Sequence, residues 1–230
     1  MLKQRESGGS GDENRKGPNL DPESLWICNV GELIEQLAST DPTPGGGSCA
    51  VVVASMGAAL LQKAVAVSLK KEPAGTPKHE ELERLLAQLG ERASVLHKSA
   101  DRDAAAYESY LRAVRLPHGD PREAELRQKA MEAATIDATL IPLSATGEIR
   151  QIVASGLPHL PLVHKVVASD AVIALRLLLT SATCLLTTAE DNLLGLTRSP
   201  AFGSFDAQRR DLARLLAESE RELERYGVDN

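Results

Sequence analysis

Residues 82–114 read LERLLAQLGERASVLHKSADRDAAAYESYLRAV, and an apolar side chain returns along this stretch at every third or fourth position. The series runs through Leu82, Leu85, Leu89, Ala93, Leu96 and Ala100. Side chains at this spacing lie on one face of an α-helix, because the helix completes a turn in about 3.6 residues. The stretch therefore predicts one long helix, from about Lys78 to Arg115, with an apolar face toward a core.

One acidic residue continues this apolar face. Asp103 stands three residues after Ala100 and four before Tyr107, so it points where the leucines point. Asp101 is two residues earlier, about 200° around the helix, and can lie on the opposite side. A carboxylate on a core-facing stripe is costly unless it is paired or placed at a cavity, and burial raises its pKa toward the range of general acid–base catalysis. Asp103 is thus either a catalytic group or a structural carboxylate bonded to Tyr or Arg on a neighbouring helix.

Helical periodicity and turn signals recur along the rest of the chain. No stretch shows the two-residue period of a β-strand, and aromatic residues make up only 3% of the sequence. We predict an all-α, up-and-down bundle of about six helices. Residues 1–22 lack apolar periodicity and are expected to form a disordered tail, so the helical domain spans residues 23–230. The expected helices cover about 23–40, 48–71, 78–115, 121–156, 163–196 and 205–226.

The segment Asp41–Ala50, DPTPGGGSCA, places three glycines directly before the very apolar helix expected over residues 48–71. A flexible linker, a phosphate-binding loop and a ligand site lined by backbone at a helix start all fit such a segment. The lysine that ends a P-loop is absent, the segment follows a helix rather than a strand, and it is not a dinucleotide G-x-G-x-x-G. A simple helix–helix connection and a backbone-lined ligand site both remain open at this point.

Charge, cysteines and histidines disfavour several classes of function. The net charge of −6 argues against nucleic acid as a partner. Three cysteines without a C-x-x-C pair suit a reducing cytoplasm, and five histidines without ligand spacing predict no metal site. No apolar run in residues 1–22 indicates a secretory signal. The apolar windows Cys49–Leu61 and Ala171–Ala189 are expected to be helices buried in the bundle, and no membrane partner is expected.

The apolar helix expected over residues 163–196 carries polar groups at both ends. Ser169 and Asp170 open it, where an N-cap explains them. Near its far end Glu190, Asp191 and Asn192 follow one another between apolar residues. Consecutive helical residues cannot all face the core, so at most one or two of these three point inward. A solvated helix end is the simpler interpretation.

Taken together, these motifs resemble one family in order and spacing. The string TPGGGS (43–48) leads into a small-residue helix, DRDAAAY (101–107) follows, and Leu116-Pro117, Pro142-Leu143 and Ser169-Asp170 come after it. The chain looks like a member of the cyclodeaminase/cyclohydrolase family, which includes the C-terminal domain of formimidoyltransferase-cyclodeaminase and stand-alone methenyltetrahydrofolate cyclohydrolase. The resemblance covers about residues 25–225, and the PGGGS and D-x-D-A-x-A-Y strings carry most of its specificity.

The resemblance implies an all-α homodimer that binds a tetrahydrofolate derivative near the dimer interface, with no further cofactor. The implied reaction is the deaminating cyclisation of 5-formimidoyl-tetrahydrofolate to the 5,10-methenyl form with release of ammonia, or hydrolysis of that methenyl form. The family's catalytic acid matches the D-x-D-A string, and we assign it to Asp103, with Asp101 second, because only Asp103 lies on the inward face. With no formimidoyltransferase domain in these 230 residues, we expect no channelling of substrate within one chain.

The resemblance also implies a set of substrate-binding residues. Backbone N–H groups of residues 45–48 would hold polar groups of the folate, and a cationic residue farther along would meet a tail of one or several glutamates. The full set is Pro44, Gly45, Gly46, Gly47, Ser48, Tyr107, Arg127, Asp170, Asn192, Lys70, Lys71 and His118, with the last three assigned to the tail.

Two departures from the family's pattern bear on activity. His118 stands where the family usually has a basic residue after Leu-Pro. The segment TAEDNL (188–193) keeps the second asparagine of the family's Asn-Val-x-Ile-Asn-Leu pattern, as Asn192, and lacks the first. A non-catalytic folate-binding or assembly protein of the same fold is therefore the alternative function.

Overall fold

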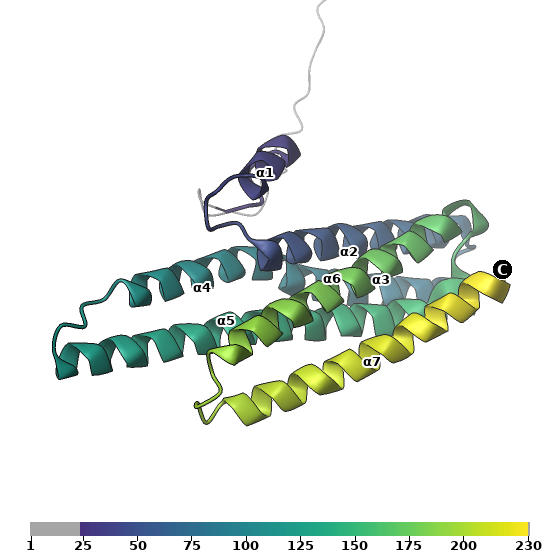
Figure 1. The fold of residues 1–230 in the computed structure, drawn as a ribbon. Helices are drawn as coiled ribbons and strands as arrows, with labels where there is room; N and C mark the ends of the chain where they lie inside the picture. The colour runs from purple at the N-terminus through teal and green to yellow at the C-terminus, as the bar shows by residue number, and fades with distance from the viewer. Residues whose placement is uncertain (1–23, 230) are drawn as a thin grey trace, which may run out of the picture.

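The computed structural model describes residues 24–229, and the chain in that range is helical with no β-strand (Figure 1). The tail predicted for residues 1–22 lies outside the described residues. The predicted all-α class is confirmed. The elements in chain order are α1 (Val30–Leu37), α2 (Gly46–Lys71), α3 (Pro77–His97), α4 (Ser99–Val114), α5 (Pro121–Gly156), the 3₁₀ segments η1 (Leu157–Leu162) and η2 (Lys165–Val167), α6 (Ala168–Leu194) and α7 (Phe202–Asp229).

Helices α2 and α6 cross closely in the core of the bundle. A Cβ atom at Gly57 of α2 would lie 3.1 Å from the carbonyl oxygen of Ala174 and 3.2 Å from Cβ of Leu177, both in α6. Ala54 is fully buried, as is Ala174 on the other side. Small side chains at these positions let the two backbones approach, which explains why the core is rich in alanine.

The same two helices stand out for their hydropathy. The stretches Gly46–Lys71 and Lys165–Leu194 are long and apolar enough to cross a membrane, judged by length and composition alone. Half of the most apolar window of each is buried inside the protein. Their packing against each other is typical of core helices, in agreement with the sequence-based interpretation.

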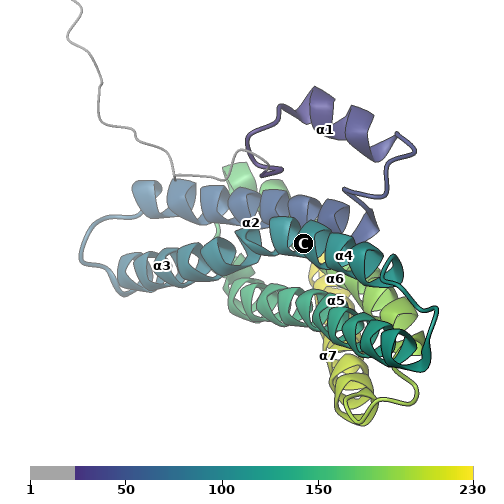
Figure 2. The same ribbon diagram turned by 90° about the vertical axis from the view of Figure 1, so that its left-hand side faces the viewer.

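Successive long helices reverse direction, in the predicted up-and-down order, with one exception (Figures 1 and 2). Helices α3 and α4 run on in roughly one direction, and together they return along α2. Helix α1 lies to one side of the bundle, near the start of α2 (Figure 2). This arrangement brings the start of α2, the middle of α4 and α5, and the end of α6 to one region of the molecule.

The prediction of one continuous helix over residues 78–115 is wrong, because the structure divides it at Lys98. The indole N–H of Trp26 donates a hydrogen bond to the carbonyl oxygen of His97 at 2.9 Å. The Trp26 ring also stacks on the His97 ring, with 3.6 Å between centroids. The last carbonyl of α3 thus has a partner from outside the helix at the point where the helical pattern is interrupted.

The starts of four helices also differ from prediction. Helix α6 begins at Ala168, after the two 3₁₀ segments, rather than at 163, and α7 begins at Phe202 rather than at 205. Residues 24–29 form turns rather than a helix, and α1 begins only after Asn29, which forms a capping box with Glu32. The Asn29 side chain accepts from the backbone N–H of Glu32 at 3.0 Å, and Glu32 Oε2 accepts from the Asn29 N–H at 2.9 Å. Helix α2 begins at Gly46, two residues earlier than expected, with Gly45 as its N-cap. Two of the three glycines therefore belong to the first turn of a helix.

Candidate functional site

A cavity of about 380 Å³ opens where the start of α2 meets α4, α5 and the end of α6. The loop before α2 and helix α4 are distant in sequence, so only the fold brings the glycines to the D-x-D-A string. The predicted residues that line the cavity are Gly45, Gly46, Gly47, Asp103, Tyr107 and Asn192. The wall is completed by Pro42, Thr43, Ala104, Ala138, Thr188 and Asp191.

Gly47 faces the Asp103 carboxylate. A Cβ atom at this position would lie 2.5 Å from Oδ1, 2.6 Å from Oδ2 and 2.7 Å from Cγ of Asp103. A side chain at this position would force the carboxylate to shift, so the absence of a Cβ allows α4 to hold its carboxylate in this place against the first turn of α2. At Gly46, by contrast, a Cβ would meet nothing within 4 Å. The two neighbouring glycines therefore have different roles.

Asp103 is half-buried and held by Ser48, which is itself fully buried behind the cavity wall. Ser48 Oγ donates to Asp103 Oδ2 at 2.9 Å and lies 3.3 Å from the carbonyl oxygen of Ala100. Burial raises the pKa of the Asp103 carboxyl above its usual value, and hydrogen bonds from the side chain and backbone of Ser48 offset part of the rise. The inward orientation predicted for Asp103 is confirmed, but its partner is a serine rather than Tyr or Arg.

The first turn of α2 adds a second influence on this carboxylate. Gly45 provides no side-chain cap, and the N–H of Cys49 makes the first intrahelical bond, to the Gly45 carbonyl at 3.0 Å. The N–H groups of residues 46–48 are therefore outside the helical ladder. A negative charge is stabilised at this end of a helix. Asp103 thus acts as the cap that α2 otherwise lacks.

The end of α6 supplies the polar wall of the cavity. Nδ2 of Asn192 donates to the carbonyl oxygen of Ala138 in α5 at 2.7 Å, which leaves the amide oxygen as an acceptor. Thr188 and Asp191 line the cavity from the preceding turn. Neither is among the predicted site residues, although their spacing to Asn192 places all three on one face of the helix.

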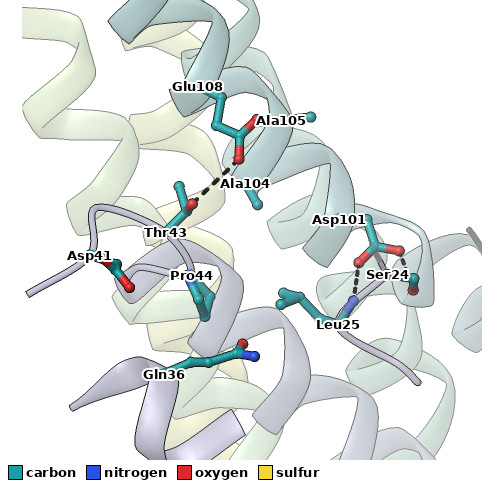
Figure 3. Close-up of a pocket in the computed structure, with 10 residues that line it drawn as sticks. All are labelled: Ser24, Leu25, Gln36, Asp41, Thr43, Pro44, Asp101, Ala104, Ala105 and Glu108. Carbon is teal, nitrogen blue, oxygen red and sulfur yellow. Dashed lines mark hydrogen bonds between the residues drawn. The ribbon is translucent and has the colours of Figure 1, made fainter. Parts of the chain in front are cut away.

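Asp101 does not line this cavity. Its carboxylate borders a neighbouring cavity of about 430 Å³ (Figure 3), where Oδ2 accepts from Ser24 Oγ at 2.7 Å and Oδ1 accepts from the Leu25 N–H at 2.9 Å. Pro44 lines this neighbouring cavity as well, and Thr43 lines both. The structure therefore places Asp101 as a tether for the segment before α1, with its carboxylate engaged away from Asp103.

Two predicted residues lie beyond the far end of α4. Arg127 of α5 donates from Nε to the carbonyl oxygen of Val114, the last residue of α4, at 2.9 Å. This bond satisfies a carbonyl that the helix leaves open. His118 is exposed in the connection between α4 and α5. Neither residue lines the cavity that contains Asp103.

Three more predicted residues lie toward the opposite end of α2. Asp170 pairs with Lys63 at 3.0 Å, and Lys63 is about 24 Å along the helix axis from Gly47, at 1.5 Å per residue. Lys70 and Lys71 are exposed in the last turn of α2, about 35 Å from Gly47 on the same scale. Within one chain, these side chains are therefore separate from the cavity.

The cavity offers a defined set of chemical groups. It has one half-buried carboxyl with a raised pKa, backbone N–H donors at a helix start, an amide oxygen and the ring of Tyr107. Such a set can bind a polar heterocycle and move a proton at a single position. Across residues 24–229, no cluster of three or more His, Cys, Asp or Glu side chains is arranged to hold a metal ion.

Comparisons with known proteins identify the family to which the chain is similar. Residues 29–208 match the family described as formiminotransferase-cyclodeaminase. Formimidoyltransferase-cyclodeaminase of Sus scrofa is 30% identical over 132 residues, which is 55% of this chain and 24% of that protein. Methenyltetrahydrofolate cyclohydrolase of Methylorubrum extorquens is 30% identical over 126 residues, 53% of this chain and 58% of that protein. The chain thus spans only part of each of these curated relatives.

A solved structure shares the fold. The formiminotetrahydrofolate cyclodeaminase of Thermotoga maritima superimposes with a TM-score of 0.64 and 21% sequence identity, covering 87% of this chain and 92% of that one. At this identity the likeness shows the fold alone, whereas the family match extends over most of the sequence and includes the glycine segment and Asp103. The chain therefore belongs to the formiminotransferase-cyclodeaminase family.

Proposed function

We propose that this protein is a folate-dependent one-carbon enzyme that acts on the carbon between N5 and N10 of tetrahydrofolate. It would convert 5-formimidoyl-tetrahydrofolate to the 5,10-methenyl derivative with release of ammonia, or hydrolyse the methenyl derivative. Membership of the family and the names of the two relatives support this chemistry. The observation that carries the proposal is the position of Asp103, whose half-buried carboxyl group lines the cavity and has a raised pKa.

In the cyclisation, N10 bonds to the formimidoyl carbon, and the bond between that carbon and the terminal nitrogen then breaks. The formimidoyl group reacts as its cation, with two hydrogens on the terminal nitrogen. A proton must then leave N10, and one proton must reach the terminal nitrogen so that it departs as ammonia and leaves the methenyl cation. One carboxylate beside the carbon serves both steps, because it accepts the first proton and donates it to the departing nitrogen. Asp103 is the group that we assign to this transfer.

Hydrolysis of the methenyl derivative uses the same group. A water molecule bonds to the bridging carbon of the methenyl cation, and one of its protons passes to the carboxylate. The carboxylate returns this proton to N5 as the bond from carbon to N5 breaks, and the remaining hydroxyl proton is released to solvent as the formyl group forms. The product is the 10-formyl derivative. Both reactions therefore place the same demand on Asp103, and they differ in the attacking group, N10 or water, and in which nitrogen leaves the carbon.

The remaining cavity groups would position the ligand. The N–H groups at the start of α2 can donate to carbonyl or ring acceptors of the pterin, and the Asn192 amide oxygen can accept from its N–H groups. Tyr107, with 43% of its surface exposed, offers a ring face to the flat heterocycle. In this proposal the glycines serve both the ligand and the carboxylate, since they leave backbone donors uncovered.

Absorbance of the methenyl chromophore tests the proposal with purified protein. Its appearance from 5-formimidoyl-tetrahydrofolate indicates the cyclodeaminase, and its accelerated loss indicates the cyclohydrolase. We expect Asp103→Asn to lower kcat by about 10²- to 10⁴-fold, the usual contribution of a general acid–base. Asp211→Asn, on the exposed face of α7, is the matched control. Undiminished turnover by Asp103→Asn would remove Asp103 from the mechanism, and tight binding of 5-formyl-tetrahydrofolate without turnover of either substrate would favour the non-catalytic alternative.

We further propose that the protein is a cytoplasmic homodimer, as the family resemblance implies. Met56 of α2 and Ile173 of α6 are each 48% exposed, on the two most apolar helices of the chain. We expect these two side chains to lie in the surface that meets the other subunit. Light scattering after size-exclusion chromatography would give the mass, and a monomer at the concentrations used for the activity assay would contradict the dimer.

A further inference from the structure

A second, smaller cavity lies one helical turn beyond the first. Its volume is about 130 Å³, and no predicted site residue lines it. Its walls are Tyr110, Gln128, Met131, Glu132, Thr135, Gly195, Arg198 and Ser199. The same three helical segments, α4, α5 and the end of α6, therefore contribute to both cavities.

The two cavities form a row rather than lying on opposite sides of the protein. Asn192 contacts Ala138, and a Cβ at Gly195 would lie 3.2 Å from Thr135, so the end of α6 runs antiparallel to α5 at this point. A step of one turn from the first cavity to the second is then a step in the same direction on both helices. Helices α4 and α5 are also antiparallel (Figure 1). Moving from Tyr107 toward the α4–α5 connection is therefore a move in this same direction.

Two aromatic rings connect the cavities along α4. Tyr107 lines the first cavity and Tyr110 lines the second, with 6.4 Å between the ring centroids. Tyr110 is seven residues beyond Asp103, about 10 Å along the axis. A benzoyl group lying along this face would meet aromatic surface over its length. The two cavities and the two rings therefore follow one another along α4, away from the carboxylate.

The second cavity ends at an arginine with an unengaged guanidinium. Arg198 is exposed and makes no hydrogen bond or ion pair with any residue in the described range 24–229. Gln128 adds amide donors to the same wall, and Glu132 is the one acidic side chain that lines it. Arginine binds carboxylates through parallel N–H donors, and this property suits it to the end of an anionic tail.

We propose that the second cavity is the subsite for the first glutamate of the folate tail, with Arg198 binding its carboxylate. The inference rests on the proposed function. In tetrahydrofolate a benzoyl group and an amide nitrogen separate N10 from the glutamate, and the rings of Tyr107 and Tyr110 line the way from the cavity of Asp103 to that of Arg198. Further glutamates would extend past Arg198 into solvent. Lys70 and Lys71, the cations that the family resemblance suggested for the tail, lie about 35 Å from the glycines in the same chain.

Equilibrium binding of two ligands tests the subsite: 5-formyl-tetrahydrofolate, and the carboxamide of 5-formyl-tetrahydropteroate, a pteroate that lacks the glutamate and carries no carboxylate. We expect Arg198→Gln to weaken binding of the glutamylated ligand about tenfold and to leave binding of the pteroate unchanged. Glu132→Gln should tighten binding of the glutamylated ligand alone, because it removes a like charge. Arg84→Gln, on the exposed face of α3, is the control for loss of a positive charge elsewhere.

The outcomes separate the subsite from the function on which it rests. A loss by Arg198→Gln that is equal for the two ligands, or no loss for either, would overturn the assignment of Arg198. If the unmodified protein binds neither ligand, the proposed folate function fails, and the subsite fails with it. A selective loss for the glutamylated ligand, reversed in sign by Glu132→Gln, would establish the subsite.

Discussion

Replacing Gly47 with alanine tests the contact on which the site depends. The added Cβ would lie 2.5 Å from Asp103 Oδ1, whereas ordinary van der Waals contact begins near 3.4 Å, so the carboxylate must move by nearly an ångström. Overpacking of this kind typically costs about 1–3 kcal/mol of folding free energy. The higher helix propensity of alanine offsets up to about 1 kcal/mol of this cost. We therefore expect Gly47→Ala to destabilise the fold by about 1–2 kcal/mol.

Gly46→Ala is the matched control, because a Cβ there meets nothing within 4 Å. Urea unfolding should show this variant as stable as the unmodified protein, or more stable by up to about 1 kcal/mol. In an Asp103→Ala background, Gly47→Ala should no longer be destabilising, since the atoms that it meets are gone. Equal stability of the two alanine variants, or full additivity of Gly47→Ala with Asp103→Ala, would refute the contact.

Three further predictions concern the carboxylates and Arg127. Burial raises the pKa of Asp103, so the folded protein holds the carboxyl proton more tightly than the unfolded chain does. The protonated Asp103 therefore contributes fully to stability below pH 3.8, and this contribution is lost as the pH rises through the raised pKa of the folded protein. Urea unfolding across this window should show the unmodified protein losing stability relative to Asp103→Asn, and parallel curves would contradict the raised pKa. Asp101→Asn should destabilise the fold by about 1 kcal/mol and speed proteolysis between residues 24 and 29, since its carboxylate accepts two bonds there, while retaining far more turnover than Asp103→Asn. Arg127→Gln should lower stability by about 1 kcal/mol through loss of the bond to Val114 and leave KM unchanged, so a large rise in KM would place Arg127 at the ligand.

The inward position of Asp103 could be predicted from the sequence because it depends only on helical period. A stripe of leucines fixes the core-facing side of the helix, and the carboxylate falls on that stripe whatever the helix packs against. The break at Lys98 could not be predicted in this way. The break coincides with a hydrogen bond from the indole of Trp26, which is more than 70 residues away in the sequence. The spacing of residues within the helix cannot predict such a distant contact.

The site was predictable to the extent that its residues share one helix start or one helix face. Gly45–Gly47, Asp103 and Asn192 meet in one cavity, whereas Asp170 matches the family's pattern equally well and lies elsewhere. Order along the chain does not give distance in a bundle, since residues at opposite ends of a 26-residue helix are about 35–40 Å apart. Thr188 could have been predicted from its position four residues before Asn192, on the same helix face, but only the fold shows that this face meets the glycines.

The two interpretations of Asp103 that the sequence leaves open, structural and catalytic, are not exclusive. Its carboxylate caps a helix whose N-cap residue is glycine and accepts a bond from Ser48, so it contributes to folding. The same bonds hold it in one orientation at the cavity wall, which proton transfer to a bound ligand requires. The helix end and the serine favour the charged form, and burial, the larger influence, favours the neutral one. Asparagine keeps the capping capacity and removes the titrating proton, so a loss of turnover in Asp103→Asn without loss of stability would separate the two roles.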